Sequence, residues 1–194
     1  MKIGLFFGSF NPVHHGHLII ANHIAYNYHF DEVWLVVSPQ NPFKAVSSLL
    51  NQNHRLYFIE AAIEGERKLK ASNIEFQLPK PSYTIDTLAY LEEKYPNHEF
   101  TIIIGSDSFQ NIKRWKNAEI ILRKYKFIIY KRPGFEIEQE QHENISIADA
   151  PFLEISSTHI RKLIQEGKSI KFLVPEKVRE EIEKYGYYKT AKEK

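Results

Sequence analysis

Residues 2–28 read KIGLFFGSFNPVHHGHLIIANHIAYNY, and this stretch decides the fold. It opens with an apolar run that is typical of a buried strand. A loop with Gly8 and Pro12 follows the run. Apolar residues then recur every three or four positions over 18–28, which predicts a helix. Strand, loop and helix in this order are typical of an α/β protein.

The rest of the chain repeats this alternation. Further strands are predicted over 32–38, 73–77, 100–105, 126–132 and 152–156, and further helices over 54–69, 84–95, 117–125, 158–165 and 175–186. Alternating strands and helices imply parallel strands joined by right-handed crossovers. We therefore expect a Rossmann-like, doubly wound parallel sheet with helices on both faces. One domain is expected over 1–188, with a flexible tail over 189–194.

Composition excludes several classes of protein. The 194 residues are 43% hydrophobic and 26% charged, which is typical of a globular domain. A net charge of +2 from scattered basic residues favours no nucleic-acid partner. Without cysteine there is neither a disulfide nor a thiolate metal site. Apolar runs fall short of the roughly 20 residues that span a bilayer, so we expect a cytoplasmic protein with no membrane partner.

The loop after the first strand lies where ligands bind in doubly wound sheets. Gly8 permits a turn there, and N–H groups from Gly8 to Phe10 and at the helix start near Gly16 can bind an anion. If the helix already includes His14, then His14 and His17 share one face and can donate hydrogen bonds to phosphate oxygens. Two alternatives stay open: half of a metal site, which no nearby carboxylate or cysteine completes, and ordinary loop residues.

Two motifs carry a resemblance to a known family. GSFNPVHHGH, residues 8–17, resembles the G-[ST]-F-[DN]-P-x-H-x-G-H signature of the adenylyl- and cytidylyltransferases, although Phe7 stands where many members have glycine. ISSTHIRK, residues 155–162, resembles their I-S-S-T-x-I-R signature. Read physically, Ser156 or Ser157 can cap a helix, and Arg161 can clamp phosphate oxygens.

The resemblance implies a fold of the nucleotidyltransferase type. It also implies that an acceptor phosphate attacks the α-phosphorus of a nucleoside triphosphate directly, with pyrophosphate leaving. The catalytic residues would be His14, His17 and Arg161. Mg²⁺ would be bound mainly through the ATP phosphates, with no metal site on the protein. The expected contacts to ATP and its phosphates are Gly8, Ser9, Phe10, His14, Gly16, His17, Lys44, Gly105, Asp107, Ile155, Ser156, Ser157 and Arg161.

Three stretches resemble bacterial nicotinate mononucleotide adenylyltransferases: PSYTIDTL at 81–88, IGSDSFQNIKRW at 104–115 and KRPG at 131–134. The resemblance implies that ATP and nicotinate mononucleotide are the partners and that nicotinate adenine dinucleotide is the product. Backbone N–H groups of Tyr83 and Thr84 would bind the nicotinate carboxylate, and Trp115 would stack on the pyridine. Lys44 would add positive charge, and Asp107 would accept hydrogen bonds from the adenosine side.

Each of these stretches has a plainer interpretation. The first is also a good helix start, Gly-Ser-Asp is a common turn, and a tryptophan is often a core residue. Nicotinamide mononucleotide or phosphopantetheine as acceptor, or a nucleotide-binding module without turnover, are the alternative functions. A homo-oligomer is compatible with the sequence, which does not decide the oligomeric state.

Overall fold

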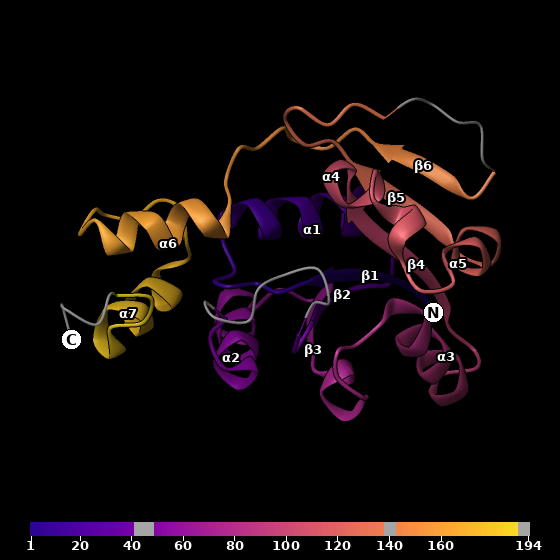
Figure 1. Cartoon of the computed structure of the whole chain (residues 1–194), viewed down its shortest axis with the longest axis horizontal. Coiled ribbons are helices and arrows are strands. Elements are labelled where there is room, and N and C mark those ends of the chain that lie inside the picture. The colour runs from indigo at the N-terminus through magenta and orange to yellow at the C-terminus, as the bar shows by residue number, and fades with distance from the viewer. Residues whose placement is uncertain (41–48, 138–142, 190–194) are drawn as a thin grey trace.

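The computed structural model describes residues 1–40, 49–137 and 143–189. Its centre is a six-stranded sheet in the order β3-β2-β1-β4-β5-β6, and all five pairings are parallel (Figure 1). The predicted α/β fold is confirmed. The strands are β1 (Lys2–Gly8), β2 (Glu32–Val37), β3 (Leu69–Ser72), β4 (Glu99–Gly105), β5 (Lys126–Tyr130) and β6 (Ile145–Ala148).

Helices cover both faces of the sheet because side chains alternate along each strand. In β1, Phe6 joins a core with α1, α2, α6 and α7, whereas Leu5 joins a second core with α3 and α5. The helices are α1 (His15–Asn27), α2 (Gln52–Ala62), α3 (Thr84–Lys94), α4 (Ser106–Phe109), α5 (Ala118–Lys124), α6 (Ser157–Gln165) and α7 (Glu176–Tyr185). The 3-10 helices η2 (Ile74–Gln77) and η3 (Ile112–Arg114) precede α3 and α5.

The strand order reverses beside β1, which pairs with β2 on one edge and with β4 on the other. Gly8 lies opposite Val37 of β2, and Gly105 lies opposite Tyr130 of β5, so these strands end at the same edge of the sheet. This reversal of order is where doubly wound folds bind ligands.

Three element predictions were wrong. The helix expected over 54–69 ends at Ala62, because the chain turns at Gly65, whose φ of +83° suits glycine. The strand expected over 73–77 is the 3-10 helix η2, and the edge strand β3 lies just before it. The last strand is β6, not 152–156: the alternating residues Ile145 and Ile147 pair with β5.

The C-terminal end returns to the domain. Gly186, in the left-handed region, ends α7, and the Tyr188 hydroxyl donates to the side-chain oxygen of Asn11 at 2.9 Å. Residues 190–194 of the expected tail lie outside the described residues. Within the described ranges, no helix combines the length and apolarity that a bilayer span requires.

Candidate active site

The loop after β1 is shaped by close packing between Gly8 and Phe10. A Cβ on Gly8 would lie 2.8 Å from the Phe10 ring. Gly8 itself ends β1, and the left-handed residue is the buried Phe10, with φ of 44°. The prediction that Gly8 supplies the unusual backbone conformation was therefore wrong. Glycine is needed because the aromatic ring occupies the space of a side chain.

His14 and His17 form a reciprocal cap at the start of α1. His14 is the N-cap in extended conformation, so the condition that the helix already includes His14 is not met. The two rings nevertheless meet: their centroids are 3.6 Å apart. The backbone N–H of each residue donates to Nδ1 of the other at 3.3 Å. An Nδ1 that accepts leaves Nε2 as the protonated nitrogen of a neutral ring.

The His14 ring is held neutral. Only 4% of the residue is exposed, and burial, reinforced by the positive charges of Arg132 and His15, lowers the pKa of His14 from 6.5 to about 3. At neutral pH this ring can donate a hydrogen bond from Nε2 but carries no charge. Gly16 makes the arrangement sterically possible, because a Cβ there would lie 2.9 Å from His14 Nδ1.

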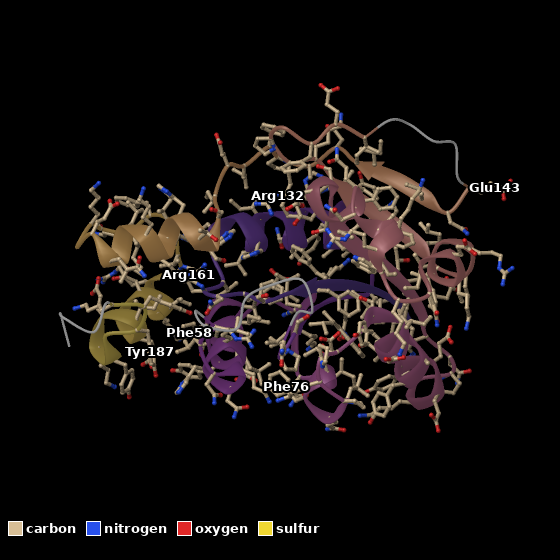
Figure 2. The ribbon with its side chains drawn as sticks, in the orientation of Figure 1. Phe58, Phe76, Arg132, Glu143, Arg161 and Tyr187 are labelled. Carbon is tan, nitrogen blue, oxygen red and sulfur yellow. The ribbon has the colours of Figure 1, made fainter. Side chains whose placement is uncertain are left out.

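The second motif is bound directly to the first. Ser156 caps α6 by accepting from the N–H of His159 at 3.2 Å, as predicted for one of the two serines. The Ser157 hydroxyl instead donates to the Pro12 carbonyl at 2.9 Å, across 145 residues of sequence. Arg161, in α6, donates an N–H to the Asn11 carbonyl at 2.8 Å (Figure 2). The two sequence motifs thus form one site.

A small cavity lies at this junction. It is lined from α1, from the chain that follows β5 and from the segment before α6, and its walls include His14, Gly16, His17, Arg132 and Ile155. Histidine N–H donors and a guanidinium facing one space suit an anion.

An acidic side chain that follows β4 meets a basic side chain that follows β5. An Arg132 N–H donates to Asp107 at 3.4 Å, and both side chains are 30% exposed. The other Asp107 oxygen, Oδ1, is buried without a hydrogen-bond partner among the described residues. A Cβ on Gly105 would lie 2.6 Å from that oxygen, so Gly105 makes room for Asp107. Its expected close approach to a nucleotide stays a prediction.

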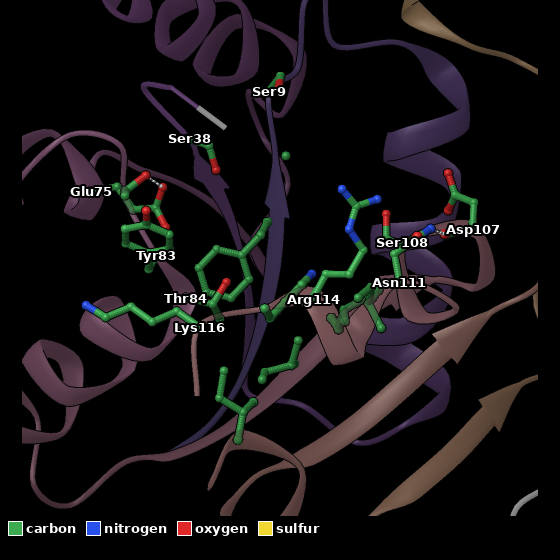
Figure 3. A pocket seen from close by; sticks show the side chains of 18 residues that line it. Ser9, Ser38, Glu75, Tyr83, Thr84, Asp107, Ser108, Asn111, Arg114 and Lys116 are labelled. Carbon is green, nitrogen blue, oxygen red and sulfur yellow. Dashed lines mark hydrogen bonds between the residues drawn. The ribbon is translucent and has the colours of Figure 1, made fainter. Parts of the chain in front are cut away.

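The predicted acceptor residues line a larger cavity of about 360 Å³ beside β1. Tyr83 and Thr84 at the start of α3 form one side with Lys116, and Asp107 and Ser108 lie opposite (Figure 3). Trp115 is half-buried, lines this cavity and packs against the second core; its stacking on the pyridine stays a prediction.

Further walls of the cavity come from Gly8 and Ser9 of the first motif. Tyr83 is the N-cap of α3, and no side chain caps this helix. The backbone N–H groups of its first turn are therefore left to donate to a ligand. The predicted residue Lys44 lies outside the described residues.

Sequence reasoning missed Glu75, which also lines the larger cavity. Its buried carboxylate accepts from the Ser82 hydroxyl at 2.6 Å and from the Thr87 hydroxyl at 2.9 Å, so it braces both sides of Tyr83 and Thr84. Burial outweighs these bonds and raises the pKa of Glu75. No signal in the sequence pointed to it, because Glu75 is a lone acid within an expected strand.

The arrangement supplies hydrogen-bond donors and positive charge around two cavities. Arg114 and Lys116 add basic side chains to the larger cavity. In the ranges that the structure describes, no three His, Asp or Glu side chains gather as ligands for a metal ion. Such a site suits substrates that carry phosphate groups.

Comparison with known proteins agrees with this geometry. Residues 5–163 match the cytidylyltransferase-like family model. The chain is 52% identical to a "probable nicotinate-nucleotide adenylyltransferase" of Cytophaga hutchinsonii over 97% of this chain and 98% of that protein. It is 49% identical to a protein of the same description from Flavobacterium johnsoniae, over 97% of this chain and all of that one.

The fold is shared with a solved structure of nicotinic acid mononucleotide adenylyltransferase from Plasmodium falciparum, complexed with NaAD. The TM-score is 0.84 at 24% identity, over 96% of this chain and 97% of the other. The two bacterial relatives match nearly the whole chain at about 50% sequence identity, and this identifies the family. The chain belongs to the nicotinate-nucleotide adenylyltransferases, within the cytidylyltransferase-like proteins.

Proposed function

We propose that this chain transfers the adenylyl group of ATP to nicotinate mononucleotide, giving nicotinate adenine dinucleotide and pyrophosphate, a step of NAD synthesis. One observation carries the proposal: Ser157 and Arg161 are hydrogen-bonded to the loop that holds His14 and His17. That joined site adjoins a cavity lined by Trp115 and the start of α3. Family membership supports the same reaction.

The reaction is a direct in-line displacement. A phosphate oxygen of the acceptor forms a bond to the α-phosphorus of ATP, and the bond from that phosphorus to the bridging oxygen of pyrophosphate breaks. No residue becomes adenylylated, because the acceptor attacks ATP itself. The chain contributes alignment and stabilisation of negative charge, which is the main source of catalysis in phosphoryl transfer.

The site residues divide between the two substrates. His14 and His17 donate from their ring nitrogens to ATP phosphates, and Arg161 places positive charge beside them. Trp115 stacks on the pyridine ring, and the Tyr83 and Thr84 N–H groups bind the nicotinate carboxylate. Backbone donors favour a carboxylate over a carboxamide, because the amide NH₂ cannot accept from them.

Mg²⁺ would be held mainly by the ATP phosphates. Asp107 fits a supporting role, since its buried Oδ1 has no partner among the described residues and a carboxylate oxygen accepts from metal-bound water. The ion, when bound, neutralises charge on the triphosphate. A cytoplasmic location is part of the proposal, because the reaction needs a supply of ATP.

The test is pyrophosphate release with ATP and Mg²⁺, comparing nicotinate mononucleotide, nicotinamide mononucleotide and phosphopantetheine. Strong preference for the first compound is the expected result. Activity with phosphopantetheine alone would support adenylyl transfer but contradict the predicted binding site for nicotinate mononucleotide. Absence of release with all three would indicate a nucleotide-binding module without turnover.

A further inference from the structure

Arg55, in the first turn of α2, has no exposed surface and makes four hydrogen bonds to backbone carbonyls. Nε donates to the Leu50 carbonyl at 2.8 Å, and one terminal nitrogen donates to the Ser9 carbonyl at 2.5 Å and to that of Ser38 at 2.9 Å. The other terminal nitrogen donates to the Pro39 carbonyl at 3.2 Å. One guanidinium therefore joins the segments after β1, after β2 and before α2.

The charge of this guanidinium is not balanced locally. Among the described residues no carboxylate forms an ion pair with Arg55, and its hydrogen bonds all go to neutral carbonyls. Burial lowers the pKa of Arg55 to about 10, which still leaves the side chain cationic at neutral pH. A buried cation without a counter-ion is costly, so its field extends into its surroundings with little screening by water.

Those surroundings are the substrate cavity. Ser9 and Ser38, whose carbonyls Arg55 holds, both line the 360 Å³ cavity (Figure 3). The Ser9 hydroxyl is buried without a partner among the described residues. Parallel strands present carbonyl oxygens at their carboxyl ends, and such oxygens repel an anion. Arg55 accordingly draws the carbonyls that follow β1 and β2 toward itself. After Ser9 the peptide is trans, so the N–H of Phe10 points the opposite way from the Ser9 carbonyl.

We propose that Arg55 is a positioning residue for the phosphate groups of the substrates. It holds the carbonyl oxygens of Ser9, Ser38 and Pro39 away from the cavity, and its unbalanced positive charge attracts the acceptor phosphate without contacting it. The inference rests on the proposed function for the identity of the acceptor. The electrostatic effect itself applies to any phosphate bound in this cavity.

Three variants separate charge, geometry and simple structural support. Arg55→Met and Arg55→Gln remove the charge, and Arg55→Lys keeps the charge but loses the forked hydrogen bonds. Arg123→Met, on the exposed surface of α5, is the matched control. Calorimetric titration with nicotinate mononucleotide and with inorganic pyrophosphate gives Kd, steady-state assays give KM and kcat, and thermal unfolding gives Tm.

We expect both neutral variants to weaken binding of each ligand and to raise the acceptor KM by about tenfold or more, which corresponds to about 1.4 kcal/mol. Arg55→Lys should recover part of the binding, and Arg123→Met should match the wild type. Kinetics of the wild type and of Arg55→Lys at two ionic strengths should show similar salt dependence.

Unchanged Kd and KM in a folded neutral variant, with only a lower Tm, would overturn the inference, because Arg55 would then be structural support. If neither neutral variant folds, Arg55→Lys decides: wild-type KM and Kd in that variant would contradict a positioning role for the fork. A wild type that does not bind nicotinate mononucleotide would count against the proposed function, and the pyrophosphate titration would still test Arg55.

Discussion

The imidazole rings of His14 and His17 stack with their centroids 3.6 Å apart, and each Nδ1 accepts the backbone N–H of the other residue. This relationship fixes both the start of α1 and the tautomers of the rings. Protonation of His14 at Nδ1 would break the cap, because a protonated nitrogen no longer accepts. The loop that precedes α1 is therefore coupled to pH through the stability of the fold.

Acid should destabilise the protein through His14. Its pKa is about 3 in the folded state and 6.5 when unperturbed, so between these values the unfolded chain binds a proton that the folded chain does not. This contribution is fully present above pH 6.5. As pH falls from 6.5 toward 3, His14 lowers the free energy of unfolding by up to about 1.4 kcal/mol per pH unit.

Urea unfolding at pH 7.5, 5.5 and 4.5 measures this loss. The matched variant is His14→Asn, since asparagine caps a helix but does not titrate in this range. Its unfolding free energy should depend less steeply on pH than that of the wild type. Parallel curves for the two proteins would show that His14 is not the group that titrates.

Replacing His17 should reduce turnover more than binding. In His17→Ala the ring that donates to the developing charge is lost, so kcat should fall by about 10²–10³, the usual effect of removing one such donor. The acceptor KM should change by less than about threefold. Stopped-assay kinetics with both substrates varied measures the two effects. An equal loss in ground-state ATP affinity and in kcat/KM would assign His17 to uniform binding instead.

Trp115 should contribute to acceptor binding. Trp115→Ala removes the stacking surface and should raise the KM for nicotinate mononucleotide by about tenfold with little change in kcat. Trp115→Phe, which keeps an aromatic face, should recover most of the affinity. Thermal unfolding serves as the control, because the residue also packs against the second core. A large fall in Tm with an unchanged KM would make Trp115 a core residue only.

Arg161 should act on catalysis with little effect on stability. Arg161→Lys loses the hydrogen bond to the Asn11 carbonyl and the planar guanidinium. We expect kcat/KM to fall by about 10² while the free energy of unfolding changes by about 1 kcal/mol, the usual net contribution of one hydrogen bond. Activity assays and urea unfolding on the same preparation give both numbers. A folded variant with the kcat/KM of the wild type would show that Arg161 is not a catalytic residue.

The sequence predicts the centre of this fold well and its edges poorly. The apolar runs that became β1, β2, β4 and β5 are buried on both faces, and such strands are recognisable from hydrophobicity alone. Edge strands β3 and β6 are short and only partly apolar, and both were missed or misplaced. Strand burial, rather than propensity, therefore separates the successful predictions from the wrong ones.

The residues of the candidate site likewise fall into those that the sequence predicts and those that it does not. Contiguous motifs identified His14, Ser157 and Arg161, because each motif forms one helix start whose residues act together. Arg55 and Glu75 were missed, because their roles depend on loops that only folding brings to them. A buried charge has no signature in the neighbouring sequence. Ser9, one hydrogen-bond partner of Arg55, lies 46 residues earlier in the chain, and the topology of the sheet brings the two together.

The central claim, direct in-line transfer at one joined site, is tested most directly by the stereochemical course at the α-phosphorus. One diastereomer of ATP that carries sulfur on the α-phosphorus is incubated with nicotinate mononucleotide and Mg²⁺, and the configuration of the dinucleotide is determined by phosphorus NMR. The account predicts nicotinate adenine dinucleotide with inverted configuration, because a single in-line displacement inverts the phosphorus. Retention of configuration, which two displacements through an adenylylated residue would give, or no dinucleotide at all, would contradict it.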